Sequence, residues 1–154
     1  MTPGTFNVES VTLEHFPMCG FAILQVAVVY CDISGRLHRS CVGMPTDGLS
    51  IPRFFWRLIG APIRNQYLLA GIVHDHYCLK AKSLPAGPLR NNLRASGDLL
   101  FREMVSVLGA GPLQAQILYS AVRIGAAASM YSPRIPDYIH EYDAFMEWYQ
   151  GVTD

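Results

Sequence analysis

The sequence predicts an α+β fold: an N-terminal β-hairpin or small antiparallel sheet, followed by a body of about four helices. Phe21–Tyr30 is rich in Val, Ile and Phe, as buried strands are, whereas later segments space their apolar residues as amphipathic helices do. The chain has 154 residues, of which 51% are hydrophobic, enough to bury the core of one domain. We therefore expect a single domain over residues 1–154, with a β part at 6–45 and a helical part at 53–150.

The β part is expected to contain a hairpin over Phe21–Cys41. Phe21–Tyr30 has the composition of a buried strand, and Asp32–Gly35 is a turn cluster in which glycine permits a positive φ. Arg36–Val42 can then return as the antiparallel partner. Gly43–Pro52 is expected to be a loop, because its two prolines stop both helix and strand propagation.

The helical part is divided by breakers. Ala81–Asn91 contains two prolines and a glycine and is expected to be a mobile connection, and Gly109–Pro112 is expected to end a helix. A short amphipathic segment is expected at Arg53–Ile59. The four expected helices are Gln66–Leu79, Leu93–Leu108, Leu113–Met130 and Asp137–Tyr149, the last with an aromatic stripe.

Charge and composition exclude several classes of protein. Charged residues make up only 16% of the chain, which argues against a disordered protein. The 12 Lys and Arg are balanced by 12 Asp and Glu, so the chain lacks the basic excess that nucleic-acid binding requires. A net charge of zero gives little repulsion between copies and favours self-association or binding to a partner.

Neither a membrane span nor a secretory signal is expected. The longest apolar stretch, Gly20–Cys31, is too short to cross a bilayer, and Met1–Glu9 has no basic segment followed by an apolar one. We therefore expect synthesis in the cytoplasm. Four cysteines without a CxxC pair (Cys19, Cys31, Cys41 and Cys78) are expected to be free thiols, although two disulfides remain an alternative.

The first candidate site is the loop around Asp47. A carboxylate in a loop fixed by glycine and proline, with backbone carbonyls turned by Gly48, suits a hard cation such as Ca²⁺. Thr46, Ser50 and Arg53 are expected to support this loop. The alternative is ordinary turn chemistry, in which Asp47 and Gly48 form a turn and Ser50 caps the next helix.

The second candidate site is the His74–Tyr77 segment within an apolar helix, and Tyr77 is expected to support it. Burying His74 and Asp75 is costly without partners. Neighbouring helix positions point about 100° apart, so these two side chains can face two adjacent subsites, one for a base and one for a cation. His74 and Cys78, four residues apart, offer an alternative Zn²⁺ site that needs further ligands; His76 lies on the wrong side of the helix to supply one.

The third candidate site is Asp98 on the following helix. Asp98 and Arg94 are one turn apart and can form a weak surface ion pair. Alternatively, Asp98 is the carboxylate that orients His74 through the second nitrogen of its ring.

The order of these motifs resembles a family of unknown function that is common in phages and prophages. The resemblance covers residues 6 to 126 and rests on Met44–Trp56, Ala70–Tyr77 and Arg94–Phe101. Members share a Thr-Asp-x-x-Ser-x-Pro-Arg loop, a helix with His-Asp and a following Tyr, and an Arg-x-x-x-Asp helix. This resemblance implies a phage setting and association with a virion, and nothing is recognised beyond Ser132.

A looser similarity is to bacterial phospholipase A2. It implies that His74 is a general base activating water, that Asp98 orients His74, and that Asp75 and Asp47 hold Ca²⁺. Phe54–Trp56 could supply an apolar rim for a lipid. That family has a His-Asp-x-x-Tyr helix, whereas Tyr77 comes one residue earlier in this chain. The disulfides that bracket the helices in the secreted enzymes of that family also have no counterpart here.

Three functions follow from these residues. The first is metal-assisted hydrolysis by a His74–Asp98 dyad, with a lipid as the substrate. The second is a non-catalytic virion or assembly protein, in which the same polar residues form a structural network. The third is a cell-wall hydrolase that uses these residues on peptidoglycan. An exposed ring nitrogen on His74 would favour catalysis, and a sealed ring would favour the structural network.

Overall fold

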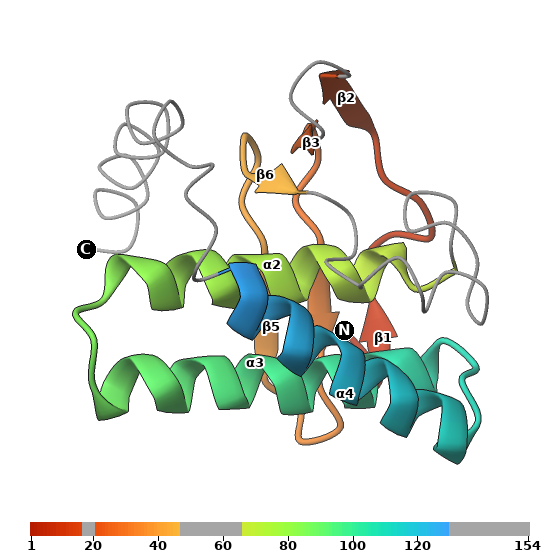
Figure 1. Cartoon of the computed structure of the whole chain (residues 1–154). Coiled ribbons are helices and arrows are strands. Elements are labelled where there is room, and N and C mark those ends of the chain that lie inside the picture. The colour runs from red at the N-terminus through yellow and green to blue at the C-terminus, as the bar shows by residue number, and fades with distance from the viewer. Residues whose placement is uncertain (17–20, 47–65, 130–154) are drawn as a thin grey trace.

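The computed structural model describes residues 1–16, 21–46 and 66–129 and confirms the α+β class (Figure 1). The helices are α2 (Leu68–Ser83), α3 (Pro88–Val107) and α4 (Pro112–Ser129). The strands are β1 (Thr5–Phe6), β2 (Leu13–Phe16), β3 (Phe21–Leu24), β4 (Val29–Cys31), β5 (Leu37–Arg39) and β6 (Pro45–Thr46). The helices expected at Arg53–Ile59 and Asp137–Tyr149 lie outside the described residues.

The strands form two small antiparallel sheets, in the orders β1-β4-β5 and β2-β3-β6. The prediction of one strand over Phe21–Tyr30 was wrong, because the chain leaves one sheet after β3 and enters the other at β4. Leu24 and Val28 are fully buried, but Val26, which an unbroken strand would bury beside them, is 42% exposed. The expected loop also contains the short strand β6, which pairs with β3.

The expected turn at Asp32–Gly35 joins β4 to β5, so the second half of the predicted hairpin is confirmed. Gly35 has a φ of +86°, a conformation that side chains other than glycine's rarely adopt, and its N–H donates to the Asp32 carbonyl. One carboxylate oxygen of Asp32 accepts the N–H groups of Ser34 and Arg36. The Asp32 side chain therefore fixes the turn that carries it.

The connection between α2 and α3 is shorter than predicted. A mobile segment was expected over Ala81–Asn91, but α2 continues to Ser83 and α3 begins at Pro88. Pro88 occupies the start of α3. Backbone N–H groups at this position have no acceptor within the helix, so a proline there costs no hydrogen bond. The two prolines therefore fall in the short link and at the start of α3, rather than marking a long loop.

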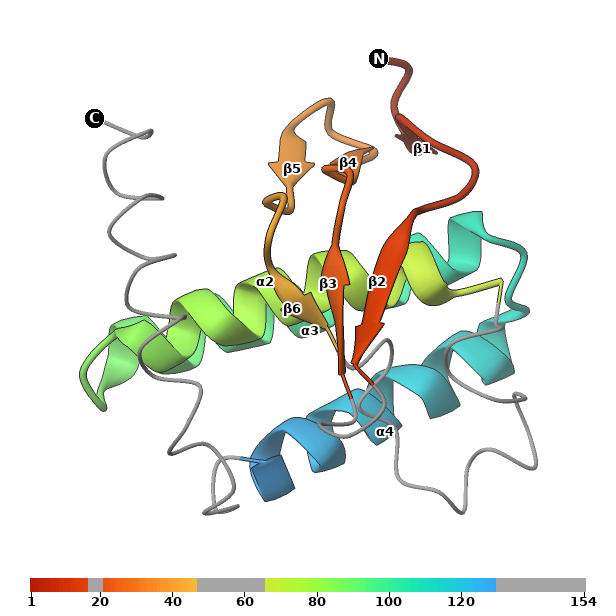
Figure 2. The same ribbon diagram turned by 90° about the horizontal axis from the view of Figure 1, so that it is seen from above.

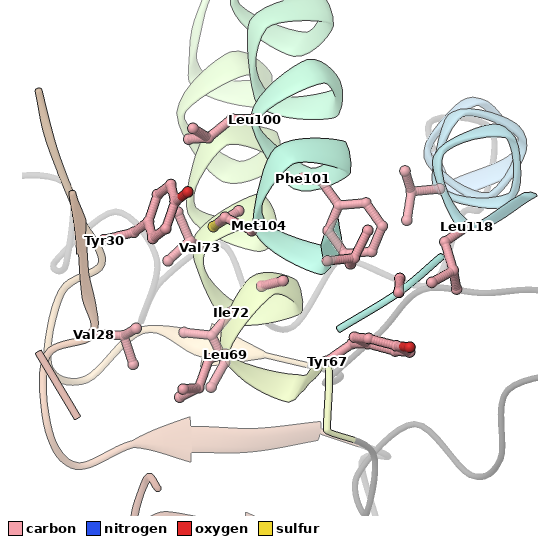
Figure 3. Close-up of a cluster of buried hydrophobic side chains, with 14 of the residues drawn as sticks. Val28, Tyr30, Tyr67, Leu69, Ile72, Val73, Leu100, Phe101, Met104 and Leu118 are labelled. Carbon is pink, nitrogen blue, oxygen red and sulfur yellow. The ribbon is translucent and has the colours of Figure 1, made fainter. Parts of the chain in front are cut away.

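Helix α2 is the centre of the domain. It runs alongside α3, and α4 crosses the pair obliquely on one face, opposite strands β1, β4 and β5 (Figures 1 and 2). Strands β2, β3 and β6 lie beside α2 on the edge that faces away from α3 (Figure 1). Every residue from Leu69 to His76 is buried, as expected for a helix covered on all sides. Figure 3 shows Ile72 and Val73 of this helix packed among Tyr30, Phe101 and Met104. None of the described helices has the length and hydropathy needed to cross a membrane.

Candidate functional site

His74 of α2 and Asp98 of α3 are in direct contact, as the sequence predicted. The Nε2–H of His74 donates to Oδ1 of Asp98 across 2.8 Å. Both residues are buried, with exposed fractions of 3% and 4%. The packing of α2 against α3 brings together two polar groups that would be costly to bury apart.

The surroundings of His74 are closed and favour its charged form. The Cys78 sulfur lies 3.8 Å from each ring nitrogen, and the ring of Phe101 packs at 5.3 Å between centroids. Burial by itself lowers the pKa of His74, but the hydrogen bond with Asp98 and the neighbouring Cys78 outweigh it, so the pKa is raised. At neutral pH, His74 and Asp98 therefore form a buried ion pair. A second cation, Arg123 of α4, lies 3.9 Å from the other oxygen of Asp98.

Asp75 is hydrogen-bonded to β6, the strand that precedes the candidate cation loop. The hydroxyl of Thr46, in β6, donates to Oδ2 of Asp75 at 2.5 Å, and both residues are buried. The other predicted loop residues, Asp47, Ser50 and Arg53, lie outside the described residues. Thr46 therefore places the beginning of the loop against Asp75.

Metal ligands were also expected on α2. Among the residues that the structure describes, no three His, Cys, Asp or Glu side chains are grouped to hold a metal ion, so His74 and Cys78 lack a third zinc ligand there. His76 is buried, and desolvation together with the charge of Lys80 lowers its pKa to about 4. His76 is therefore neutral at neutral pH.

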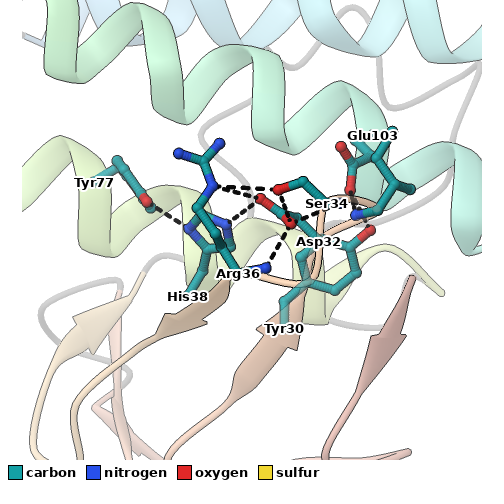
Figure 4. A network of polar contacts seen from close by, with 8 residues as sticks. Tyr30, Asp32, Ser34, Arg36, His38, Tyr77 and Glu103 are labelled. Carbon is teal, nitrogen blue, oxygen red and sulfur yellow. Dashed lines mark hydrogen bonds and ion pairs between the residues drawn. The ribbon is translucent and has the colours of Figure 1, made fainter. Parts of the chain in front are cut away.

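Tyr77, predicted to support the same site, belongs to a second polar network (Figure 4). Its hydroxyl donates to Nδ1 of His38 in β5 across 2.7 Å. The Nε2–H of His38 donates to Oδ2 of Asp32 across 2.9 Å. Arg94, the remaining predicted residue, is half-buried on α3, one turn before Asp98.

The hairpin end of this network is bound to α3 through Glu103. A carboxylate oxygen of Glu103 accepts the hydroxyl of Tyr30 across 2.7 Å and the N–H of Ile33 across 3.0 Å. Burial and the Glu103 hydrogen bond raise the pKa of Tyr30, so Tyr30 remains protonated. The hydrogen bonds from His38 and Ser34 lower the pKa of Asp32, so Asp32 is a carboxylate at neutral pH.

An open groove of about 970 Å³ lies over this second network. Asp32, His38 and Tyr77 line it together with residues of α3. Sequence reasoning identified the Asp32 turn but missed His38 as a site residue. The only sequence signal was a histidine in a strand close to a turn aspartate, and its partner Tyr77 is 39 residues away along the chain.

Comparison with known proteins finds one relative and one family for this chain. It is 41% identical over 59 residues to an uncharacterized protein of Sinorhizobium fredii, y4jT; these residues are 36% of this chain and 17% of that protein's length. No solved structure matches the chain. Residues 22–122, which include both polar networks, match a family described as a protein of unknown function, DUF1353. The chain therefore belongs to the DUF1353 family of proteins of unknown function.

Proposed function

We propose that the protein is a cation-assisted hydrolase in which His74 activates water. Asp98 orients the ring of His74 and stabilises its protonated form. The observation that carries this proposal is the 2.8 Å hydrogen bond between Nε2 of His74 and Asp98. A base whose second nitrogen is fixed by a carboxylate is the usual arrangement for general-base catalysis. Lipid esters are the first substrates to test, because the looser similarity of these motifs is to bacterial phospholipase A2.

The cation half of the site would be built from Asp75 and Asp47. Thr46 contacts Asp75, and Asp47 is the next residue, one Cα step of about 3.8 Å along the chain. The carboxylates of Asp75 and Asp47 could share one Ca²⁺, which would polarise the ester carbonyl. The first test of this half is therefore whether activity needs Ca²⁺, with Zn²⁺ as the alternative ion.

The protonation of His74 sets a condition on this activity. A general base must be unprotonated before it can take a proton from water, and the raised pKa keeps His74 charged at neutral pH. Hydrolysis would therefore be slow at neutral pH and faster under alkaline conditions.

The second candidate function is a non-catalytic phage virion or assembly protein, with these residues as an internal scaffold. It is favoured by the 3% exposure of His74 and by the position of Cys78, 3.8 Å from both ring nitrogens. Fully satisfied buried networks of this kind fix the packing of helices. The phage setting itself rests on motif resemblance alone.

The distinguishing experiment combines hydrolysis assays with thermal melts of the wild type and of His74→Asn. Phosphatidylcholine vesicles and peptidoglycan are the substrates, each with Ca²⁺, with Zn²⁺ or with a chelator. The hydrolase proposal predicts lipid hydrolysis that the chelator stops and that His74→Asn lowers by about 10²-fold or more. His76→Asn, which changes another buried histidine of the same helix, is the matched control and should retain the activity.

The scaffold alternative predicts a different pair of results. His74→Asn would then lower the free energy of unfolding by about 1–3 kcal/mol, because Asp98 loses its charged partner. The wild type would hydrolyse neither substrate with either ion, and that result would reject the hydrolase. Cation-dependent release of peptidoglycan fragments without lipid hydrolysis would instead identify a cell-wall hydrolase.

A further inference from the structure

Asp32, His38 and Tyr77 form a continuous hydrogen-bonded series in a groove, separate from the His74 site. Asp32 is a carboxylate and only accepts hydrogen bonds, so the proton between Asp32 and His38 resides on Nε2. In the neutral ring, Nδ1 is then the unprotonated nitrogen, and it accepts the hydroxyl proton of Tyr77. A carboxylate thus orients a base, and the base accepts the proton of a hydroxyl. This arrangement activates a hydroxyl group as a nucleophile.

The packing around this series keeps its geometry fixed. Asp32 is held by the turn that it caps and is 4% exposed. Gly97 of α3 faces the base of the Tyr77 side chain so closely that a Cβ there would lie 2.6 Å from Cβ of Tyr77. Tyr77 is thus pressed between α3 and the hairpin, with its hydroxyl directed at His38 (Figure 4). Holding a nucleophile and its base in a fixed geometry raises the reaction rate above that of the same groups free to move.

The groove offers room and suitable walls for a substrate. It contains Tyr77 and His38 and is lined by apolar side chains of α3, among them Leu93, Leu99 and Leu100. Arg36 lines the same groove, and its side chain is 79% exposed. An apolar chain can pack along the leucines while a guanidinium stabilises negative charge developing on a carbonyl oxygen.

We propose that Tyr77 is a nucleophile for carboxylic esters that carry an apolar chain, with His38 as its base and Asp32 as the positioning residue. The Tyr77 oxygen attacks the ester carbonyl carbon, and its proton passes to Nδ1 of His38. As the acyl–tyrosine bond forms, the bond to the alcohol oxygen breaks and His38 returns the proton to that alcohol. Water then cleaves the acyl–tyrosine, so that ester and water give acid and alcohol.

This second site works without a metal ion, so it is separable from the proposed function. The test uses 4-nitrophenyl hexanoate with the full chain in the presence of a chelator, which silences a cation-assisted site. Release of 4-nitrophenolate is followed together with intact mass and peptide mapping. The expected result is an early release of about one nitrophenolate per chain, with the hexanoyl group on Tyr77.

Tyr119 of α4 is a control within the same chain. Its hydroxyl accepts a hydrogen bond from Arg123 across 3.1 Å, and its ring faces Arg102, so it has cationic neighbours in place of a histidine base. Tyr77→Phe should abolish the early release, and His38→Gln should slow it by about 10²-fold. Tyr119→Phe should leave it intact.

Two results would overturn the proposal. One is a wild type in which Tyr77 carries no hexanoyl group. The other is labelling of Tyr119 or of surface lysines as fast as Tyr77. Both are read from the wild type alone, so a variant that fails to fold does not weaken the test.

Discussion

Thr46 links the β2-β3-β6 sheet to helix α2 by a hydrogen bond. Its hydroxyl donates to Oδ2 of Asp75, and the pair is buried. Thr46→Val keeps the shape but removes this donor from a buried carboxylate. We expect a loss of about 1–3 kcal/mol in the free energy of unfolding, measured by urea denaturation. Thr46→Ser retains the hydroxyl and should lose much less; equal losses for the valine and serine variants would contradict a role for the hydrogen bond.

At the residue scale, polarity within an apolar helix was the informative signal. His74 and Asp98 were expected to meet because each is a polar residue at an inward position of adjacent helices, and they do. His38 gave no such signal. A half-buried histidine in an edge-like strand is common, and only the tertiary packing of β5 on α2 shows that its partner is Tyr77. Sequence spacing cannot supply that contact, because it joins elements 39 residues apart.

At the element scale, the close approach of α2 and α3 depends on Gly97. An alanine there would normally stabilise a helix by about 1 kcal/mol. At this position its methyl group would lie 2.6 Å from Cβ and 3.0 Å from Cγ of Tyr77, atoms that cannot swing away. We expect Gly97→Ala to lower the free energy of unfolding by about 1–3 kcal/mol.

Gly87 is the matched control for this substitution. A Cβ added at Gly87 meets nothing within 4 Å, and its φ of 163° is extended backbone that alanine adopts. Gly87→Ala should therefore change the free energy of unfolding little in the same urea series. A Gly97→Ala protein as stable as the wild type would show that the helices do not depend on this contact.

The helices were easier to predict than the strands for a physical reason. Helix spacing and breakers are local, so all three described helices were expected, with errors only at their ends. The strand over Phe21–Tyr30 was predicted unbroken because its composition is uniformly apolar, whereas the two sheets require a bend near Val26. Strand boundaries depend on partners that are remote in sequence, which composition does not reveal.

At the scale of the whole molecule, three buried groups give stability a maximum near neutral pH. The pKa of His74 is raised, so its contribution is complete below the unfolded value of about 6.5 and is lost as pH rises through the folded value. The pKa of His76 is lowered to about 4, so stability falls as pH drops from about 6.5 toward 4. The lowered pKa of Asp32 adds a further loss as pH falls below about 3.9.

Thermal melts between acidic and alkaline pH test this balance. We expect the highest melting temperature between about pH 6 and 7, with a decline on both sides. His76→Asn should flatten the acid decline, and His74→Asn should flatten the alkaline one. A wild-type melting temperature that rises steadily from pH 6 to pH 9 would contradict the charged state assigned to His74.

The pH dependence of ester hydrolysis by the wild type and by Asp98→Asn tests the central claim most directly. Phosphatidylcholine vesicles with Ca²⁺ are the substrate, and the rate that remains with a chelator, where only the metal-independent Tyr77 chemistry could act, is subtracted at each pH. The wild-type rate should rise toward alkaline pH as His74 loses its proton. A neutral amide in place of the Asp98 carboxylate does not stabilise the protonated ring of His74 by charge. The midpoint of the rate's rise with pH should therefore move to lower pH, and the maximal rate should fall at least about tenfold. The same midpoint in both proteins, or no lipid hydrolysis by the wild type at any pH, would contradict a hydrolytic role for the His74–Asp98 pair.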